Sequence, residues 1–171
     1  MVIKNQIANM MTFLSLSLGV LAIFIMLKID NPLIPVILIT FCGILDRYDG
    51  KVARHLNIES DLGKQLDSFT DLIVFIISPI VFICQLNLFG LLWVAFLAIL
   101  LFVSSGLYRL ARFNLSDQKT CQSGLPTTVA GMMLIWYSYV HHIFKFNESV
   151  LIVIIVLLSF LMISRFAWKK I

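Results

Sequence analysis

The chain has 171 residues, of which 60% are hydrophobic and only 13% are charged, and its mean hydropathy is +0.99. Soluble globular domains carry roughly 45–50% apolar and about 25% charged residues, so the composition excludes that class together with disordered, collagen-like and coiled-coil chains. Three scattered cysteines exclude a disulfide framework. The net charge is +4, and the basic residues lie between apolar segments, which is typical of a membrane protein rather than of a protein that binds nucleic acid.

Six apolar segments follow in chain order, at residues 9–27, 32–49, 66–85, 88–108, 127–142 and 150–166. Each is close to the length of about 20 residues that a helix needs to cross a bilayer. Backbone groups in hydrocarbon must form hydrogen bonds within their own segment, so each segment is expected to be helical. The sequence predicts an all-α, polytopic membrane protein with six transmembrane helices in one domain over residues 1–171. The first segment lacks a small-x-small cleavage pattern, so we expect it to be retained.

The basic residues are distributed unevenly between the two sides of these six helices. One side receives only Lys28 and Lys145, and the other receives eleven of the thirteen basic residues. Those eleven are Lys4, Arg47, Lys51, Arg54, Lys64, Arg109, Arg112, Lys119, Arg165, Lys169 and Lys170. The positive-inside rule therefore predicts that both termini and the 47–64 and 109–124 loops are cytoplasmic.

Four carboxylates lie inside or at the edge of the second and third apolar segments: Asp46, Asp49, Asp67 and Asp71. An aspartate at the centre of a membrane helix costs about 2.5–3.5 kcal/mol on insertion scales. A single aspartate at such a place is explained equally well as a solvated residue that caps the end of a helix and as a functional residue. Four in two adjacent helices favour a functional site.

The spacing of these acids places them on two helical stripes. Asp46, Asp49, Gly50 and Ala53 follow an i, i+3, i+4, i+7 pattern, and Gly63, Asp67 and Asp71 follow an i, i+4, i+8 pattern. The connection between the two helices is short, so we expect antiparallel neighbours whose stripes face each other across a cytoplasm-facing cavity. Small residues beside the acids allow close approach of another helix backbone or of a flat ligand.

Four facing carboxylates repel one another unless a cation lies among them. Mg²⁺ and Mn²⁺ prefer oxygen ligands, and both stripes lack histidine and cysteine. Arg54 follows the first stripe and can bind a phosphate in a bidentate manner, although it also fits the positive-inside pattern. The residues indicate a metal-dependent enzyme that acts on a phosphate or diphosphate at the cytoplasmic interface.

The same residues match a family signature. The segment from Asp46 to Asp71 reads DxxDGxxAR-x8-GxxxDxxxD and resembles the CDP-alcohol phosphatidyltransferases at every fixed position. Members have six transmembrane helices, usually pair as homodimers, and transfer a phosphatidyl group from a CDP-linked lipid to an alcohol with release of CMP. The resemblance implies an enzyme of the plasma membrane of a prokaryote, with its active site facing the cytoplasm.

The resemblance also implies roles for individual residues. Asp46, Asp49 and Asp67 hold one divalent metal ion, Mg²⁺ or Mn²⁺, while Asp46, Asp67 and Asp71 contribute to a second, and Asp71 is the general base. The residues that bind the CDP-lipid are Asn9, Thr12, Gly50, Ala53, Arg54, Ser60 and Gly63. Many relatives have asparagine where this chain has Ser15.

Residues 108–114 and the run Gly124-Leu125-Pro126 resemble the branch of the family that uses serine as the acceptor. The substrates implied are CDP-diacylglycerol and serine, with Arg109, Arg112 and Asn114 as candidate acceptor-binding residues. The two arginines are equally well explained as topology anchors. This branch commonly has proline where the chain has Thr128.

Two other functions fit parts of the pattern. A sibling enzyme could use glycerol 3-phosphate or inositol as the acceptor. A phosphorylated acceptor such as glycerol 3-phosphate calls for additional cationic residues near the site. A small ion-coupled transporter fits the bare composition, but the sequence has no internal repeat of the kind that transporters often carry.

Overall fold

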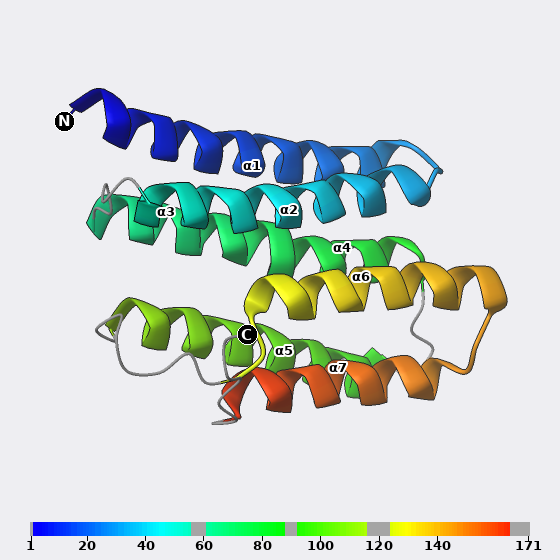
Figure 1. The fold of residues 1–171 in the computed structure, drawn as a ribbon. Helices are drawn as coiled ribbons and strands as arrows, with labels where there is room; N and C mark the ends of the chain where they lie inside the picture. Colours follow the sequence, from blue (N-terminus) through cyan, green and yellow to red (C-terminus); the bar gives the residue numbers. More distant parts are fainter. Residues whose placement is uncertain (1, 56–60, 88–91, 116–123, 165–171) are drawn as a thin grey trace.

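The computed structural model describes residues 2–55, 61–87, 92–115 and 124–164, and within these ranges the side chains of residues 2–9, 49–55, 61 and 92 are not described. All the regular secondary structure of the described chain is helical, and the described residues contain no strand. Its elements are α1 (Val2–Lys28), α2 (Leu33–His55), α3 (Asp61–Asp71), the π-helix η1 (Leu72–Ile77), α4 (Ser78–Gln85), α5 (Leu92–Leu115), α6 (Thr127–Phe144) and α7 (Glu148–Ile163). Because α3, η1 and α4 form one continuous rod, these elements make six rods (Figure 1).

The six rods confirm the six helical segments that the hydropathy pattern predicts. Within the described ranges, three are long and apolar enough to cross a membrane, at Met10–Lys28, Leu62–Gln85 and Trp93–Leu115, and Glu148–Ile163 is a shorter apolar helix. The second helix continues beyond residue 49 to His55 as a polar extension. The last helix ends at Ile163 rather than at residue 166, because Ser164 leaves the helical region with ψ of 147°.

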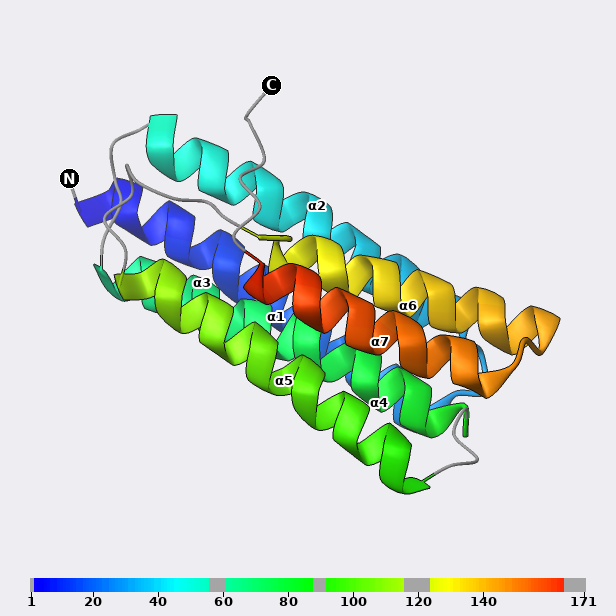
Figure 2. The ribbon, with the colours of Figure 1, turned by 90° about the horizontal axis from the view of Figure 1, so that it is seen from below.

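The rods lie side by side in three layers (Figures 1 and 2). The antiparallel pair α1 and α2 forms one outer layer, and α5 with α7 forms the other. The α3–η1–α4 rod and α6 lie in the middle. One apolar cluster fills the space around Met26, Ile39 and Phe82, and another surrounds Phe102, Leu134 and Leu158. The middle layer is therefore buried between two apolar cores.

The π-helix η1 packs closely against three other helices. Three consecutive residues of η1 each lie against a glycine from a different helix: Val74 against Gly19 of α1, Phe75 against Gly131 of α6, and Ile76 against Gly106 of α5. A Cβ atom on any of these glycines would collide with η1. Small residues of this kind allow the backbones of membrane helices to approach closely.

A proline explains why the α-helical pattern is interrupted here, a feature that the hydropathy pattern did not predict. In a regular α-helix the carbonyl of Phe75 would accept a hydrogen bond from the residue at position 79, which is Pro79 and has no N–H. A π-helix pairs residues at a spacing of five instead, and the backbone N–H of Ser78 indeed donates to the carbonyl of Ile73. Asp71 is the residue immediately before η1, so the π-helix lies directly beside the acidic stripe.

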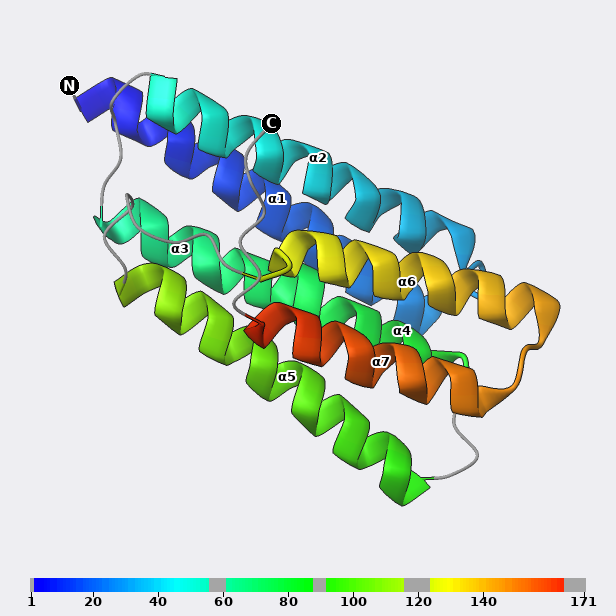
Figure 3. The ribbon, with the colours of Figure 1, turned by 60° about the horizontal axis from the view of Figure 1, so that its bottom comes forward.

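Helix α6 runs antiparallel to α2 with a regular register. Met132 lies against Gly43, and one turn further along the indole N–H of Trp136 donates to Thr40 Oγ1 at 2.9 Å. Figure 3 shows α6 beside both α2 and the α3–η1–α4 rod. The first turn of α6 is thereby brought to the acidic ends of α2 and α3.

Candidate active site

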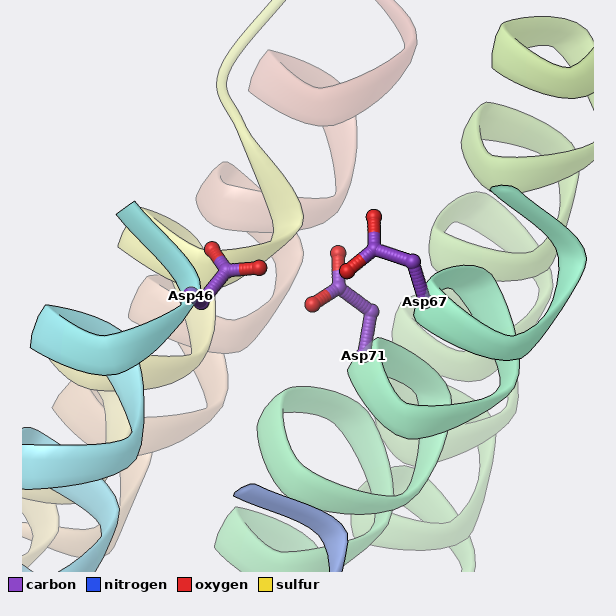
Figure 4. A group of neighbouring side chains, drawn as sticks. All are labelled: Asp46, Asp67 and Asp71. Atoms are coloured by element: carbon purple, nitrogen blue, oxygen red, sulfur yellow. The ribbon is translucent and has the colours of Figure 1, made fainter. Parts of the chain in front are cut away.

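Three of the four predicted acids converge in one cluster. Asp46 comes from α2, whereas Asp67 and Asp71 lie one turn apart on α3. One carboxylate oxygen from each of them lies within 4.8 Å of the others. Figure 4 shows the three side chains directed toward a common space between the two helices. The prediction that the two acidic stripes face each other is confirmed for these residues.

The charges in this cluster fit a divalent cation. Asp71 is only 9% exposed, and Asp46 and Asp67 are partly buried, so solvent screens their mutual repulsion incompletely. Arg109 of α5 attracts both Asp46 and Asp71. Oxygen ligands from carboxylates are those that Mg²⁺ and Mn²⁺ prefer. The described residues therefore fit the metal that the sequence pattern predicts.

Two threonines of α6, which the sequence reasoning did not select, complete the surroundings of the acids. The hydroxyl of Thr127 donates to Asp71 Oδ2 at 3.1 Å, and the hydroxyl of Thr128 donates to Asp46 Oδ2 at 3.0 Å. Arg109 Nη1 donates in turn to Thr127 Oγ1 at 3.1 Å. The sequence pointed to this region in two ways only: through the adjoining Gly124-Leu125-Pro126 run, and through Thr128, which stands where related sequences commonly have proline.

The segment before α6 explains why the two threonines lie at this place. Gly124 has φ of +92°, and a Cβ on it would lie 2.8 Å from the carbonyl oxygen of Ser164 at the end of α7. The next residue, Leu125, donates its N–H to the carbonyl of Leu161 at 3.0 Å. Only glycine adopts this φ without strain and leaves room for the α7 carbonyls. Pro126 then precedes the first turn of α6, which is fixed against the end of α7.

A second polar cluster joins α3 to the end of α5. Ser68 Oγ donates to Asn114 Oδ1 at 3.1 Å, and Lys64 Nζ donates to the carbonyl of Asn114 at 3.1 Å. The same ammonium group lies 5.2 Å from the centre of the Phe113 ring. These bonds hold the end of α5, with Asn114, against α3 beside Asp67.

Three further predicted site residues, Thr12, Gly63 and Arg112, belong to the described part of the chain. Thr12 of α1 lines an apolar recess with Phe13, Leu66 and Phe69, and Gly63 lies partly buried in the first turn of α3. Arg112 lies in the last turn of α5, one turn after Arg109. The side chains of the remaining predicted residues fall outside the described part of the structure: Asn9, Asp49, Gly50, Ala53, Arg54 and Ser60.

His141, Lys28 and Lys145 lie at the end of the bundle opposite the acids. Helix α6 begins at the acidic cluster and carries His141 near its other end, where the imidazole is 3% exposed and packs against Tyr137 and Phe146. Lys28 and Lys145 also lie at that end, as the last residue of α1 and the residue after α6. His141 is therefore separated from the acidic cluster by most of the length of α6.

Comparison with known proteins identifies the family. The model of the CDP-alcohol phosphatidyltransferase family matches residues 5–168. The chain is 34% identical to CDP-diacylglycerol–serine O-phosphatidyltransferase of Bacillus subtilis, over 94% of this chain and 88% of that protein. Proteins of the same name from Helicobacter pylori and Methanocaldococcus jannaschii are 31% and 29% identical, covering 95% and 96% of this chain and 71% and 74% of their own lengths. With the signature acids gathered at one end of a six-rod helical membrane protein, the chain belongs to the CDP-alcohol phosphatidyltransferase family and is an enzyme of that class.

Proposed function

We propose that this enzyme transfers the phosphatidyl group of CDP-diacylglycerol to the hydroxyl of L-serine, giving phosphatidylserine and CMP. The observation that carries the proposal is the convergence of Asp46, Asp67 and Asp71 from the two halves of the signature. The serine acceptor is supported by the names of the relatives, three of which match at 29–34% identity over nearly the whole chain.

In the proposed reaction the serine hydroxyl attacks the phosphorus that carries diacylglycerol. The bond from that phosphorus to the CMP oxygen breaks, and CMP leaves with the bonding electrons. Asp71 accepts the hydroxyl proton as the new phosphorus–oxygen bond forms. Because Thr127 donates to Asp71 Oδ2, we assign the proton to Oδ1. The described site offers no activated serine or cysteine beside the acids, which favours direct displacement over a covalent enzyme intermediate.

Asp46, Asp49, Asp67 and Asp71 would hold two divalent ions, Mg²⁺ or Mn²⁺. Bound there, the ions supply positive charge to the diphosphate oxygens as the leaving group departs. The donor lipid is assigned to Asn9, Thr12, Gly50, Ala53, Arg54, Ser60 and Gly63, on the family resemblance.

The serine carboxylate is assigned to Arg109, with Arg112 and Asn114 nearby. Arg109 uses Nη1 on Thr127, while its buried Nε finds no hydrogen-bond partner among the described residues. A buried N–H without a partner costs about 1–3 kcal/mol, and a substrate carboxylate would satisfy it. Arg109 would then bind the acceptor within reach of the general base.

We further infer that the enzyme is a homodimer in the plasma membrane of a prokaryote, with both termini and the acidic cluster on the cytoplasmic side. The orientation is supported by the eleven basic residues on one side against Lys28 and Lys145 on the other. Cysteine labelling of intact cells tests it: a cysteine introduced at Lys145 should react with an impermeant reagent, and one introduced at Lys4 should not.

The acceptor is tested with purified protein in detergent, CDP-diacylglycerol, and serine, glycerol 3-phosphate or inositol supplied separately. We expect CMP release with serine and little with the other two. CMP release with glycerol 3-phosphate or inositol alone would assign the enzyme to a sibling activity, and no CMP release with any acceptor would contradict the proposed reaction.

A further inference from the structure

The first turn of α6 carries two adjacent hydroxyls that are not needed as metal ligands, general base or substrate contacts in the proposed reaction. Thr127 is 1% exposed and bonds Asp71, whereas Thr128 is partly buried and bonds Asp46. Consecutive residues of a helix point about 100° apart, because there are 3.6 residues in each turn. The two threonines therefore reach acids on two different helices.

Thr127 Oγ1 links Arg109 to Asp71 in one chain of hydrogen bonds. A guanidinium group only donates hydrogen bonds, so Thr127 Oγ1 must accept from Arg109 Nη1. An ionised carboxylate only accepts, so the hydroxyl proton of Thr127 is directed to Asp71 Oδ2, 3.1 Å away. This oxygen is held as an acceptor, and the carboxylate cannot rotate without breaking the chain of bonds.

Thr128 acts on Asp46 from the other side of the cluster. An ionised carboxylate only accepts hydrogen bonds, so the hydroxyl donates to Asp46 Oδ2 at 3.0 Å. The same helix is held against α2 by the Met132–Gly43 contact and the Trp136–Thr40 bond, one and two turns further on. The position of Thr128 relative to α2 is therefore set by packing, and Thr128 can in turn set the position of Asp46.

We propose that Thr127 and Thr128 are a pair of positioning residues that set the orientation and separation of the Asp71 and Asp46 carboxylates. Carboxylates this close repel each other and would turn apart, and each threonine restrains one oxygen of its partner. These two bonds occupy only Oδ2 of each carboxylate. The inference rests on the metal-dependent function proposed above, and it gives a role to Thr128, where the family resemblance leads one to expect proline.

The test uses the full-length protein in detergent and measures Mn²⁺ binding directly, from the loss of the electron paramagnetic resonance signal of free Mn²⁺. We expect Thr128→Val and Thr127→Val each to bind Mn²⁺ about 3- to 10-fold more weakly, the effect of one lost hydrogen bond. Thr128→Ser keeps the hydroxyl and should bind within about twofold of wild type. Ser138→Ala is the matched control, because Ser138 is a buried hydroxyl of the same helix that bonds only the carbonyl of Leu134.

The outcomes separate this inference from the proposed function. If wild-type protein binds Mn²⁺ and both valine variants bind it equally well, the positioning role is wrong while the metal-dependent reaction stands. If wild-type protein binds no Mn²⁺ and releases CMP without metal, the proposed function itself fails. Thr128→Ala removes the same hydroxyl with a smaller side chain and replaces the valine variant if that protein unfolds at the assay temperature.

Discussion

Replacing Gly131 with alanine should separate α6 from η1 and thereby disturb the acidic cluster. A Cβ at this position would collide with the backbone carbonyl oxygen of Phe75 and would lie 2.7 Å from Phe75 Cα. Carbon atoms in contact are about 3.5–4.0 Å apart, so the two helices must move apart by about 1 Å. The clash is with the backbone, so no side-chain rotation can relieve it.

The same movement would reach the site, because Thr127 lies one turn before Gly131 and Asp71 one turn before Phe75. The Thr127–Asp71 distance of 3.1 Å would lengthen beyond hydrogen-bonding range. Overpacking costs about 1–3 kcal/mol, against a gain of about 0.5–1 kcal/mol from replacing a helical glycine by alanine. We expect a lower melting temperature in detergent and a loss of CMP release.

Gly43→Ala is the matched control for this experiment. A Cβ on Gly43 would lie 2.5 Å from Met132 Sδ, which is part of a flexible side chain that can rotate away. Each substitution adds one methyl group at a contact of α6, with η1 for Gly131 and with α2 for Gly43. The two variants therefore differ mainly in whether the added methyl group meets backbone or a flexible side chain. A Gly131→Ala protein that melts and turns over like Gly43→Ala would refute the argument that η1 and α6 are in rigid backbone contact.

Three further predictions concern the chemistry of the site. Chelation with EDTA should abolish CMP release and added Mn²⁺ or Mg²⁺ should restore it, because three clustered carboxylates offer the oxygen ligands that these ions prefer. Full activity of metal-stripped protein would contradict this. Asp71→Asn should lower kcat more than it weakens CDP-diacylglycerol binding, whereas Asp46→Asn should weaken metal and donor binding together; near-normal turnover of Asp71→Asn would exclude it as the base. Arg109→Lys should raise the serine KM by roughly 10–150-fold, the value of a charge-assisted hydrogen bond of about 1.5–3 kcal/mol, with little change in the CDP-diacylglycerol KM. A defect confined to the donor KM would instead assign Arg109 to the donor site, and the same assays on Arg112→Lys establish which arginine binds serine.

Local patterns in the sequence were sufficient to predict the helices and the convergence of three acids. Hydropathy over about 20 residues identifies a membrane helix without reference to its neighbours. The spacing of Asp67 and Asp71 places both on one face of a helix, and the short connection to the helix of Asp46 leaves an antiparallel hairpin as the simple arrangement. The structure confirms that these three carboxylates lie together.

The threonine contacts and the π-helix were decided by the tertiary structure. Thr127 lies 56 residues from Asp71 and Thr128 lies 82 residues from Asp46, so neither bond leaves a local periodicity in the sequence. Their formation depends on the register of α6 against α2 and η1, which is set by glycines such as Gly131 and by the docking of Gly124 on the end of α7. Pro79 was visible in the sequence, but membrane helices accommodate proline in several ways. Local hydropathy and spacing thus determined which residues form helices and which acids share a helix face. Contacts between helices distant in the sequence determined which hydroxyls orient those acids.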